Sequence, residues 1–199
     1  MLVIGLTGGV AMGKSTVAEV FAGEGAAVFD ADRAVHALYQ GGAAAGAIGD
    51  AFPGAVAGGI VDRRKLAALI ATDSAALARL EAIVHPLVRA AEDAFRRAAA
   101  MSGSRIAVLD IPLLFETGGD RRVDAVVVVS TTPEIQRQRA TRRGGLSELE
   151  LAALTARQMP DAEKRRRAHF IIDTSGPLEA TRRQVRDLMR ALAARAATR

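Results

Sequence analysis

The sequence predicts an α/β fold in which helices cover both faces of a parallel sheet. Two observations carry this prediction. Short apolar runs without polar alternation recur along the chain, as at residues 2–6 and 125–129, and such runs are typical of strands buried on both sides. Segments with helical periodicity separate these runs, and that order favours a parallel sheet over an antiparallel one.

Five strands are expected, at residues 2–6, 27–29, 106–109, 125–129 and 169–172. The first is followed by a helix over residues 14–23, and a helix over 177–194 closes the chain. Thr132 and Pro133 predict the start of another helix, because Thr is a good cap and Pro suits the first turn. The stretch 33–102 has helical patterns but no strand pattern, so it reads as a helical insertion after the second strand.

The composition limits the classes of protein that fit. Half of the residues are hydrophobic, and there is no Cys, which excludes disulfides and thiolate metal sites. No uncharged apolar run approaches the ~18 residues of a membrane helix, so we expect a soluble, cytoplasmic protein. The net charge of +5 fits either nucleic acid or an anionic small molecule, but few aromatic residues are present for base stacking.

The most informative motif begins directly after the first strand. Residues Gly8-x-x-x-x-Gly13-Lys14-Ser15 match the phosphate-loop pattern. In such a loop, backbone N–H groups and a helix N-terminus surround phosphate oxygens, the Lys reaches the β- and γ-phosphates, and the Ser hydroxyl binds Mg²⁺. The predicted ATP-binding residues are Gly9, Val10, Ala11, Met12, Gly13, Lys14, Ser15 and Thr16. The loop alone leaves open a kinase, a switch or a binding module.

Carboxylates follow two of the other predicted strands. Asp110 ends the third strand, where a carboxylate could bind Mg²⁺. Asp30 and Asp32 follow the second strand, and in extended chain both would point to the same side. A carboxylate there could take the proton of an acceptor hydroxyl. The alternative is that Asp32 only caps the next helix.

Two further groups have both a functional and a structural interpretation. His85 precedes Pro86, which predicts a helix break; the His could bind an anionic substrate or lie at the edge of the core. Arg139 and Arg143 are spaced for one helix face and precede two glycines. They could close over phosphates as part of a lid, or form a solvated basic face.

Taken together, these motifs resemble the dephospho-coenzyme A kinase family along nearly the whole chain. The matching stretches include residues 4–8 and 13–16, Asp30-Ala-Asp32, residues 59–63, His85-Pro86, residues 110–116 (DIPLLFE), the Arg139/Arg143 pair, Gln158 and residues 172–176. The phosphate loop is common to many kinases, whereas the combination of DAD, HP and PLLFE at these spacings is specific.

The resemblance implies a P-loop NTPase-type fold with a five-stranded parallel sheet. It also implies transfer of phosphate from ATP, with Mg²⁺, to the 3′-hydroxyl of the dephospho-CoA ribose. A single domain over 1–199 is expected, with a core of 1–32, 103–135 and 169–199. The insertion of 33–102 would bind the CoA part, and residues 136–168 would form the lid.

Site roles follow from the resemblance, residue by residue. Asp32, Lys14 and Arg139 are expected to be catalytic, with Asp32 as the base. Arg143, Ser175 and Gly176 would join the phosphate loop in binding ATP. Asp32, His85, Pro86, Leu113 and Leu114 would bind the substrate, and Ser15 and Asp110 the metal.

The chain departs from the family pattern at three positions. Ala11 and Met12 stand where Gly and Ser are common, so we expect altered ATP affinity with function retained. Thr174 replaces a common Asn, which argues against an adenine contact through that side chain. No nucleic-acid or membrane partner is expected, and the protein should be a monomer or a weak homo-oligomer. The competing hypotheses are a kinase with another acceptor and a nucleotide-dependent binding module.

Overall fold

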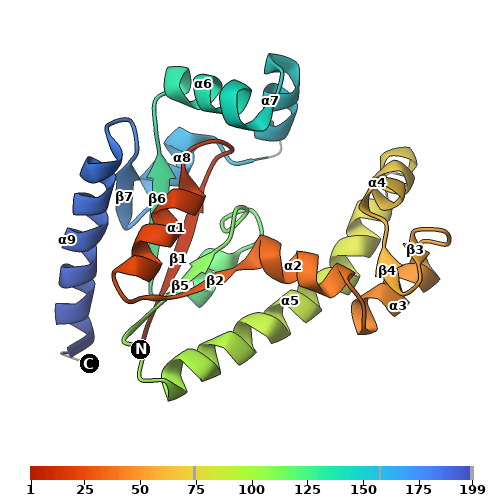
Figure 1. Cartoon of the computed structure of the whole chain (residues 1–199), viewed down its shortest axis with the longest axis horizontal. Coiled ribbons are helices and arrows are strands. Elements are labelled where there is room, and N and C mark those ends of the chain that lie inside the picture. Colours follow the sequence, from red (N-terminus) through yellow and green to blue (C-terminus); the bar gives the residue numbers. More distant parts are fainter. Residues whose placement is uncertain (74, 157, 198–199) are drawn as a thin grey trace. The chain divides into compact units, whose positions relative to one another are not determined.

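A computed structural model describes residues 1–73, 75–156 and 158–197, without the side chains of Thr72, Arg143, Ala196 and Ala197. It divides the chain into two compact units (Figure 1). The first unit comprises Met1–Phe29 and Ala98–Arg199, and the second comprises Asp30–Arg97. Among the described residues, no helix is long and apolar enough to cross a membrane.

The first unit contains the main sheet. Its strands are β1 (Leu2–Gly8), β2 (Ala27–Asp30), β5 (Ile106–Asp110), β6 (Ala125–Ser130) and β7 (Phe170–Asp173). The helices are α1 (Lys14–Gly23), η1 (Gly119–Arg122), α6 (Pro133–Gly144), α7 (Glu148–Thr155), α8 (Asp161–Arg167) and α9 (Leu178–Ala197). The five predicted strands are thereby confirmed, with ends shifted by one or two residues.

The strand order is β2-β5-β1-β6-β7, with β1 in the centre. Strand β1 pairs in parallel with β5 on one side and with β6 on the other, and β6 pairs in parallel with β7. The chain leaves β1 toward the β2 edge, returns to β5 beside β1, and then crosses to β6 and β7 on the other side of β1. The carboxyl end of such a central strand is where open α/β sheets bind ligands.

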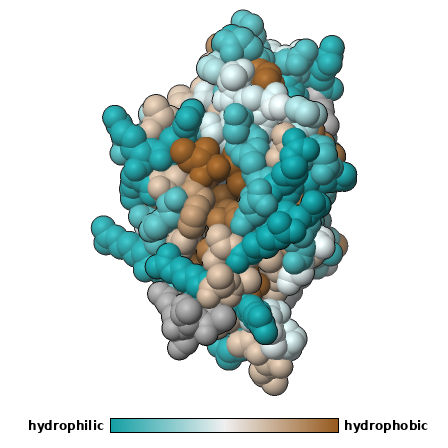
Figure 2. All heavy atoms as spheres, turned by 90° about the vertical axis from the view of Figure 1, so that its left-hand side faces the viewer, coloured by the Kyte–Doolittle hydropathy of each residue, from teal (hydrophilic) through white to brown (hydrophobic). Residues whose placement is uncertain are grey.

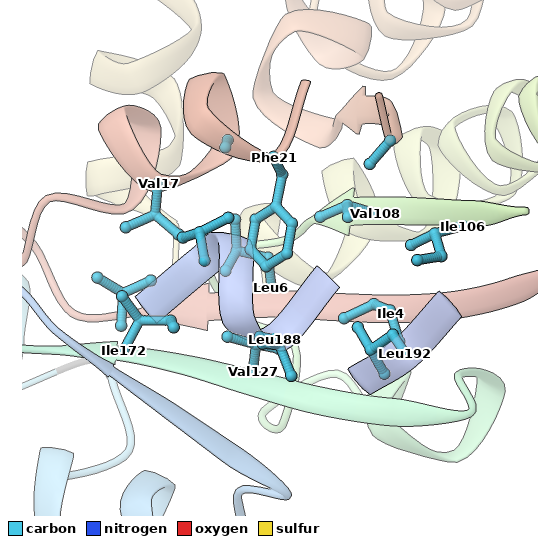
Figure 3. Close-up of a cluster of buried hydrophobic side chains, with 14 of the residues drawn as sticks. Ile4, Leu6, Val17, Phe21, Ile106, Val108, Val127, Ile172, Leu188 and Leu192 are labelled. Atoms are coloured by element: carbon cyan, nitrogen blue, oxygen red, sulfur yellow. The ribbon is translucent and has the colours of Figure 1, made fainter. Parts of the chain in front are cut away.

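One face of the sheet is covered by α1 and α9, and their side chains form its core (Figure 3). Val17 and Phe21 of α1 are fully buried there, and Leu188 and Leu192 of α9 pack against the same strands. The helix start at Lys14 that the sequence predicts is confirmed. Because this core is built mainly from aliphatic side chains, a chain with 4% aromatic residues can still bury a large apolar surface.

The opposite face packs against the loop that follows β5. Leu114 and Phe115 of this loop are buried against Val126 and Val128 of β6. A Cβ atom at Gly5 would lie 2.7 Å from Leu114 Cδ2, so a larger residue here would force the Leu114 side chain to shift. The loop is therefore fixed to the sheet at the strand that leads into the phosphate loop.

The second unit has its own apolar core, formed by α2 (Ala31–Tyr39), α3 (Ala43–Ala51), α4 (Arg63–Thr72) and α5 (Ala76–Met101). Ile48 and Phe52 are buried at its centre. The prediction that residues 33–102 contain no strand is wrong, because β3 (Val56–Ala57) and β4 (Ile60–Val61) form a small antiparallel hairpin. Strands this short, with two glycines between them, leave almost no periodicity to detect.

Pro86 does not interrupt the helix that contains it. Helix α5 runs for 26 residues through this position, so the predicted break at His85 is wrong. A proline removes one backbone donor and disfavours helix in the residue before it. The apolar face of α5 packs into the core of the unit, with Leu80, Ile83, Val84 and Val88 on both sides of the proline. This packing outweighs the local preference.

Candidate functional site

The phosphate loop connects the central strand β1 to α1. Gly8 ends the strand beside β6, where an added Cβ would lie 2.6 Å from the Val129 carbonyl oxygen. Gly13 caps α1 with a φ of 91°, a left-handed conformation that favours glycine. The two glycines of the motif are therefore required by the backbone, and the loop delivers Lys14 to the first position of the helix.

Lys14 is paired with the carboxylate at the end of the neighbouring strand. Its ammonium group forms an ion pair with Asp110, and the Asp110 side chain is only 5% exposed. Parallel strands end at the same edge of a sheet, which explains why residues 96 positions apart meet here. The phosphate-loop lysine and the carboxylate that ends β5 therefore meet at one edge of the sheet, a contact that the sequence does not predict.

Ala11 and Met12 affect the backbone conformation and the packing of the phosphate loop. Ala11 has a φ of 60°, and it is the one non-glycine residue with positive φ in the described part of the chain. Such a conformation costs a residue with a Cβ about 1–2 kcal/mol. The Met12 side chain is buried in the core under α1. Met12 therefore anchors the loop by packing, which a Ser at this position could not do.

Arg139 is connected to the loop through Thr174. The guanidinium donates to the Thr174 hydroxyl at 2.9 Å and to its carbonyl oxygen at 2.6 Å. The same hydroxyl donates to the Met12 carbonyl at 2.7 Å. Thr174 is 5% exposed, so its side chain serves this network. That it makes no adenine contact stays a prediction.

The segment after β7 is held in a defined turn next to Thr174. The Ser175 N–H donates to the Asp173 carboxylate at 2.7 Å. The hydroxyl and N–H of Ser175, with the charge of Arg165, hold the pKa of Asp173 below its ordinary value. Ser175 is half-buried and Gly176 is exposed, so both are open to a ligand. The side chain of Arg143 lies outside the described residues.

Sequence reasoning missed an ion pair that fixes the start of α8. Lys164 is fully buried, and its ammonium lies 3.0 Å from Glu116 of the loop after β5. Burial alone would raise the pKa of Glu116, but the Met159 N–H and the Lys164 charge outweigh it, and the pKa lies below the ordinary value. Three arginines follow Lys164 in sequence, and a basic cluster of this kind fits either a lid over phosphates or a solvated face, so nothing local identifies Lys164 as buried.

Two glutamines were also missed as contacts of the phosphate loop. The Gln136 amide donates to the Val10 carbonyl at 2.8 Å, and the Gln158 amide oxygen accepts from the Val10 N–H at 3.2 Å. Gln136 lies in α6 and Gln158 follows α7. Gln158 stood among the motif residues, but nothing in its local pattern identified its partner.

Leu113 and Leu114 differ in how accessible they are. Leu113 is 38% exposed, whereas Leu114 is fully buried beneath Gly5. A direct contact with a substrate is therefore available to Leu113 in this arrangement, and Leu114 acts through packing. Their predicted role in substrate binding stays a prediction.

Asp32 and His85 belong to the second unit. Asp30, at the end of β2, caps α2 by accepting from the Arg33 N–H at 2.9 Å. Asp32 is exposed in the first turn of α2. The expectation that Asp30 and Asp32 share one side of an extended chain is therefore wrong, because helix begins at Ala31. The capping alternative is also wrong for Asp32, since Asp30 provides that contact.

The donor atoms of Ser15 and Asp110 suit the Mg²⁺ that is expected there from the sequence. The Ser15 hydroxyl and the Asp110 carboxylate are oxygen donors, which Mg²⁺ prefers. Within the described residues, no group of three or more His, Cys, Asp or Glu side chains could hold a metal ion alone. A Mg²⁺ site with few protein ligands suits an ion that is bound mainly by substrate phosphates and water.

A groove of about 400 Å³ lies between α1 and α9. It is lined at one end by Thr16 and Leu178, which follow the phosphate loop and the Asp173–Gly176 turn, and elsewhere by Val20, Arg182 and Arg186. Figure 2 shows the side of the molecule that carries α9, where hydrophobic side chains gather between hydrophilic ones.

Comparison with known proteins gives a consistent result. A family model described as dephospho-CoA kinase matches residues 2–180. A dephospho-CoA kinase from Nitrobacter winogradskyi is 55% identical over 97% of this chain and 96% of its own length. Another from Mesorhizobium japonicum is 58% identical over 93% of each chain.

A solved structure agrees with these relatives. The dephospho-CoA kinase from Campylobacter jejuni has a TM-score of 0.70 and 25% identity, covering 96% of this chain and 97% of that one. The fold, transferase class and family predicted from the sequence are confirmed, and a kinase of this family uses ATP and dephospho-CoA. The chain belongs to the dephospho-CoA kinase family, which catalyses the final step of CoA biosynthesis.

Proposed function

We propose that this chain carries out its family's reaction with ATP on the phosphate loop and Asp32 as the general base. The γ-phosphoryl group would pass to the 3′-hydroxyl of the dephospho-CoA ribose, giving CoA and ADP. The observation that carries the proposal is the ion pair of Lys14 with Asp110 at the carboxyl end of the central strands. A lysine placed there is positioned to neutralise phosphate charge.

The phosphate side of the reaction would rest on the first unit. Backbone N–H groups of residues 9–16 would bind the phosphates, and Lys14 would stabilise charge on the transferring group. Arg139 is already oriented by Thr174 beside Gly13, where it can add positive charge. Arg143 would contribute from the same helix, and Ser175 and Gly176 would contact the nucleoside part.

The acceptor side would rest on the second unit. The Asp32 carboxylate would take the proton from the 3′-hydroxyl as that oxygen bonds to the γ-phosphorus, and the bond to the ADP oxygen breaks. Its exposure supports this role, as does the capping of α2 by Asp30, which leaves Asp32 unnecessary for the helix start. His85, Pro86, Leu113 and Leu114 would bind dephospho-CoA.

Ser15 and Asp110 would hold Mg²⁺, which supplies charge neutralisation between the phosphates. Asp110 now pairs with Lys14, so the carboxylate already lies among the groups that would surround the phosphates. A cytoplasmic location and a monomeric or weakly associated state are part of this proposal; cell fractionation and sedimentation would test them.

Product analysis by mass spectrometry tests the proposed reaction. The protein is mixed with ATP, Mg²⁺ and a panel of acceptors: dephospho-CoA, adenosine, nucleoside monophosphates and shikimate. We expect one phosphate to be added to dephospho-CoA alone, with a product identical to CoA. A reaction without acceptor measures ATP hydrolysis. Phosphorylation of another acceptor, or ATP binding without transfer, would contradict the proposal.

A further inference from the structure

The backbone N–H and the backbone carbonyl of Val10 are both bound by side chains from distant parts of the chain. The carbonyl accepts from Gln136 Nε2 at 2.8 Å, and the N–H donates to Gln158 Oε1 at 3.2 Å. We propose that these two residues, here called the glutamine clamp, are positioning residues that hold the phosphate loop ready for ATP. Neither residue needs to touch the reacting atoms for this role.

The clamp lies next to the one strained residue of the loop. Ala11, which follows Val10, has a φ of 60°, which glycine adopts freely and alanine does not. A backbone in this state tends to relax unless its neighbours are fixed. The clamp fixes the neighbour on the N-terminal side, so it opposes the relaxation of Ala11.

The C-terminal neighbour of Ala11 is fixed by different contacts. The Met12 side chain is buried in the core, and its carbonyl accepts from the Thr174 hydroxyl at 2.7 Å. Ala11 therefore lies between two anchored residues. Only the Val10 anchor depends on the glutamines, so their removal would release one side of the strained residue while leaving the other intact.

The geometry requires a donor at position 136 and an acceptor at position 158. Gln136 must donate to a carbonyl and Gln158 must accept from an N–H, and an amide can do either. A carboxylate at position 136 has no proton to donate, whereas a carboxylate at 158 can still accept. Gln158 Oε1 also lies 3.6 Å from the position of a Cβ at Gly9, so it faces the beginning of the loop.

The clamp also joins the phosphate loop to the predicted lid region of 136–168. Gln136 is in the first turns of α6, and Gln158 follows α7, while Lys164 fixes the next helix to Glu116. The inference rests on the proposed function only in placing ATP on this loop. If ATP binds there and acceptors are phosphorylated, the clamp can still prove irrelevant, so the two proposals fail separately.

The test measures affinity for a non-hydrolysable ATP analogue with Mg²⁺ by calorimetry on the full chain. Gln136→Met and Gln158→Met keep side-chain length and remove the hydrogen bonds. Gln138→Met is the matched control, because Gln138 is exposed on the same helix. We expect each clamp variant to bind the analogue about three- to tenfold more weakly, on the scale of one lost hydrogen bond, and the control to change less than twofold.

The same substitutions in a chain that carries Ala11→Gly test whether the clamp acts by opposing the strain at Ala11. Ala11→Gly removes the strain, so the loop can hold its shape without the clamp. In this background we expect each clamp substitution to weaken binding less than about twofold, as a double-mutant cycle detects. In the chain that keeps Ala11, each clamp substitution should raise the KM for ATP. The kcat at saturating ATP should stay close to that of the original chain.

Two results would overturn the proposal. One is a clamp variant with a lower melting temperature whose affinity for the analogue equals that of Gln138→Met. The other is an equal loss of affinity with Ala11 and with Gly at this position. If a Met variant does not fold, Gln136→Glu replaces it; the donor is lost and weaker binding is again expected, whereas unchanged binding would refute the clamp.

Discussion

The two compact units are held together by contacts of different sequence range. In the first unit, the residues around the phosphate loop are joined across more than 100 positions, as in Gln158 to Val10 and Thr174 to Met12. In the second unit, Asp62 caps α4 two and three residues away, and Asp73 binds Arg79 at 2.9 Å. Contacts of long sequence range fix the backbone of the phosphate loop in the first unit. In the second unit, short-range contacts fix the starts of individual helices.

The largest effect is expected when Lys14, the phosphate-loop lysine of the first unit, is removed. Lys14→Ala should lower turnover with every acceptor by about 10²–10³-fold, the scale for removing a group that stabilises transition-state charge. Lys65→Ala, an exposed lysine in α4 of the second unit, is the control and should leave turnover nearly unchanged. Steady-state kinetics compares the turnover of the two variants. Equal losses of turnover would contradict a role of Lys14 in stabilising phosphate charge.

The next effect concerns the buried pair beside the loop. Glu116→Gln leaves Lys164 buried without its charged partner, so it should lower the free energy of unfolding by about 3–5 kcal/mol. Replacing both residues by Met should restore most of the loss, because the charge is then absent. Urea unfolding measures both. A single variant as stable as the original would show that the pair contributes little.

The same pair predicts a pH dependence with a defined sign. The pKa of Glu116 in the folded chain lies below the ordinary 4.5, so its contribution is fully present above that pH. As pH falls through the folded pKa, the carboxylate is protonated and the contribution is lost. The stability difference between the original chain and Glu116→Gln should therefore shrink below about pH 4.5. A difference that stays constant to pH 3 would contradict this.

A smaller effect separates the cores of the two units. Ile48→Ala in the second unit and Leu6→Ala in the first both remove a fully buried side chain, so each should cost about 2–5 kcal/mol. Only Ile48→Ala should leave affinity for an ATP analogue unchanged while weakening dephospho-CoA binding. Hydrogen exchange should open residues 30–97 first in that variant. Faster exchange throughout the chain would show that the units unfold together.

Much of the first unit follows from local pattern. The apolar runs predict its strands, the glycine and lysine spacing predicts the loop, and Thr132 begins α6 by capping the Ile135 N–H as expected. These signals are local because they reflect backbone conformation and periodicity. The position of Asp110 at the same sheet edge as the phosphate loop also follows, once parallel strands are assumed to end at one edge.

The remaining errors come from contacts that no local pattern encodes. Gly5 appeared as an ordinary strand residue, yet its missing Cβ admits Leu114. Lys164 lies in a run of basic residues, yet it is fully buried. Packing around Pro86 sustains a helix that local preference would end. Asp30 and Asp32 were judged from extended geometry, while the cap at Asp30 starts helix one residue later. The first three depend on tertiary contacts, whereas the cap at Asp30 is a local contact that changes the backbone conformation of Asp32.

In the proposed reaction the first unit binds ATP, and Asp32 of the second unit serves the chemical step. The most direct test compares Asp32→Asn with Asp30→Asn, since Asn caps a helix as well as Asp does. Turnover is measured together with calorimetric binding of an ATP analogue and of dephospho-CoA. For Asp32→Asn, we predict that both ligands bind within about threefold of the original chain and that turnover falls by about two orders of magnitude or more. Asp30→Asn should turn over nearly normally, and normal turnover of Asp32→Asn would show that Asp32 is not the general base.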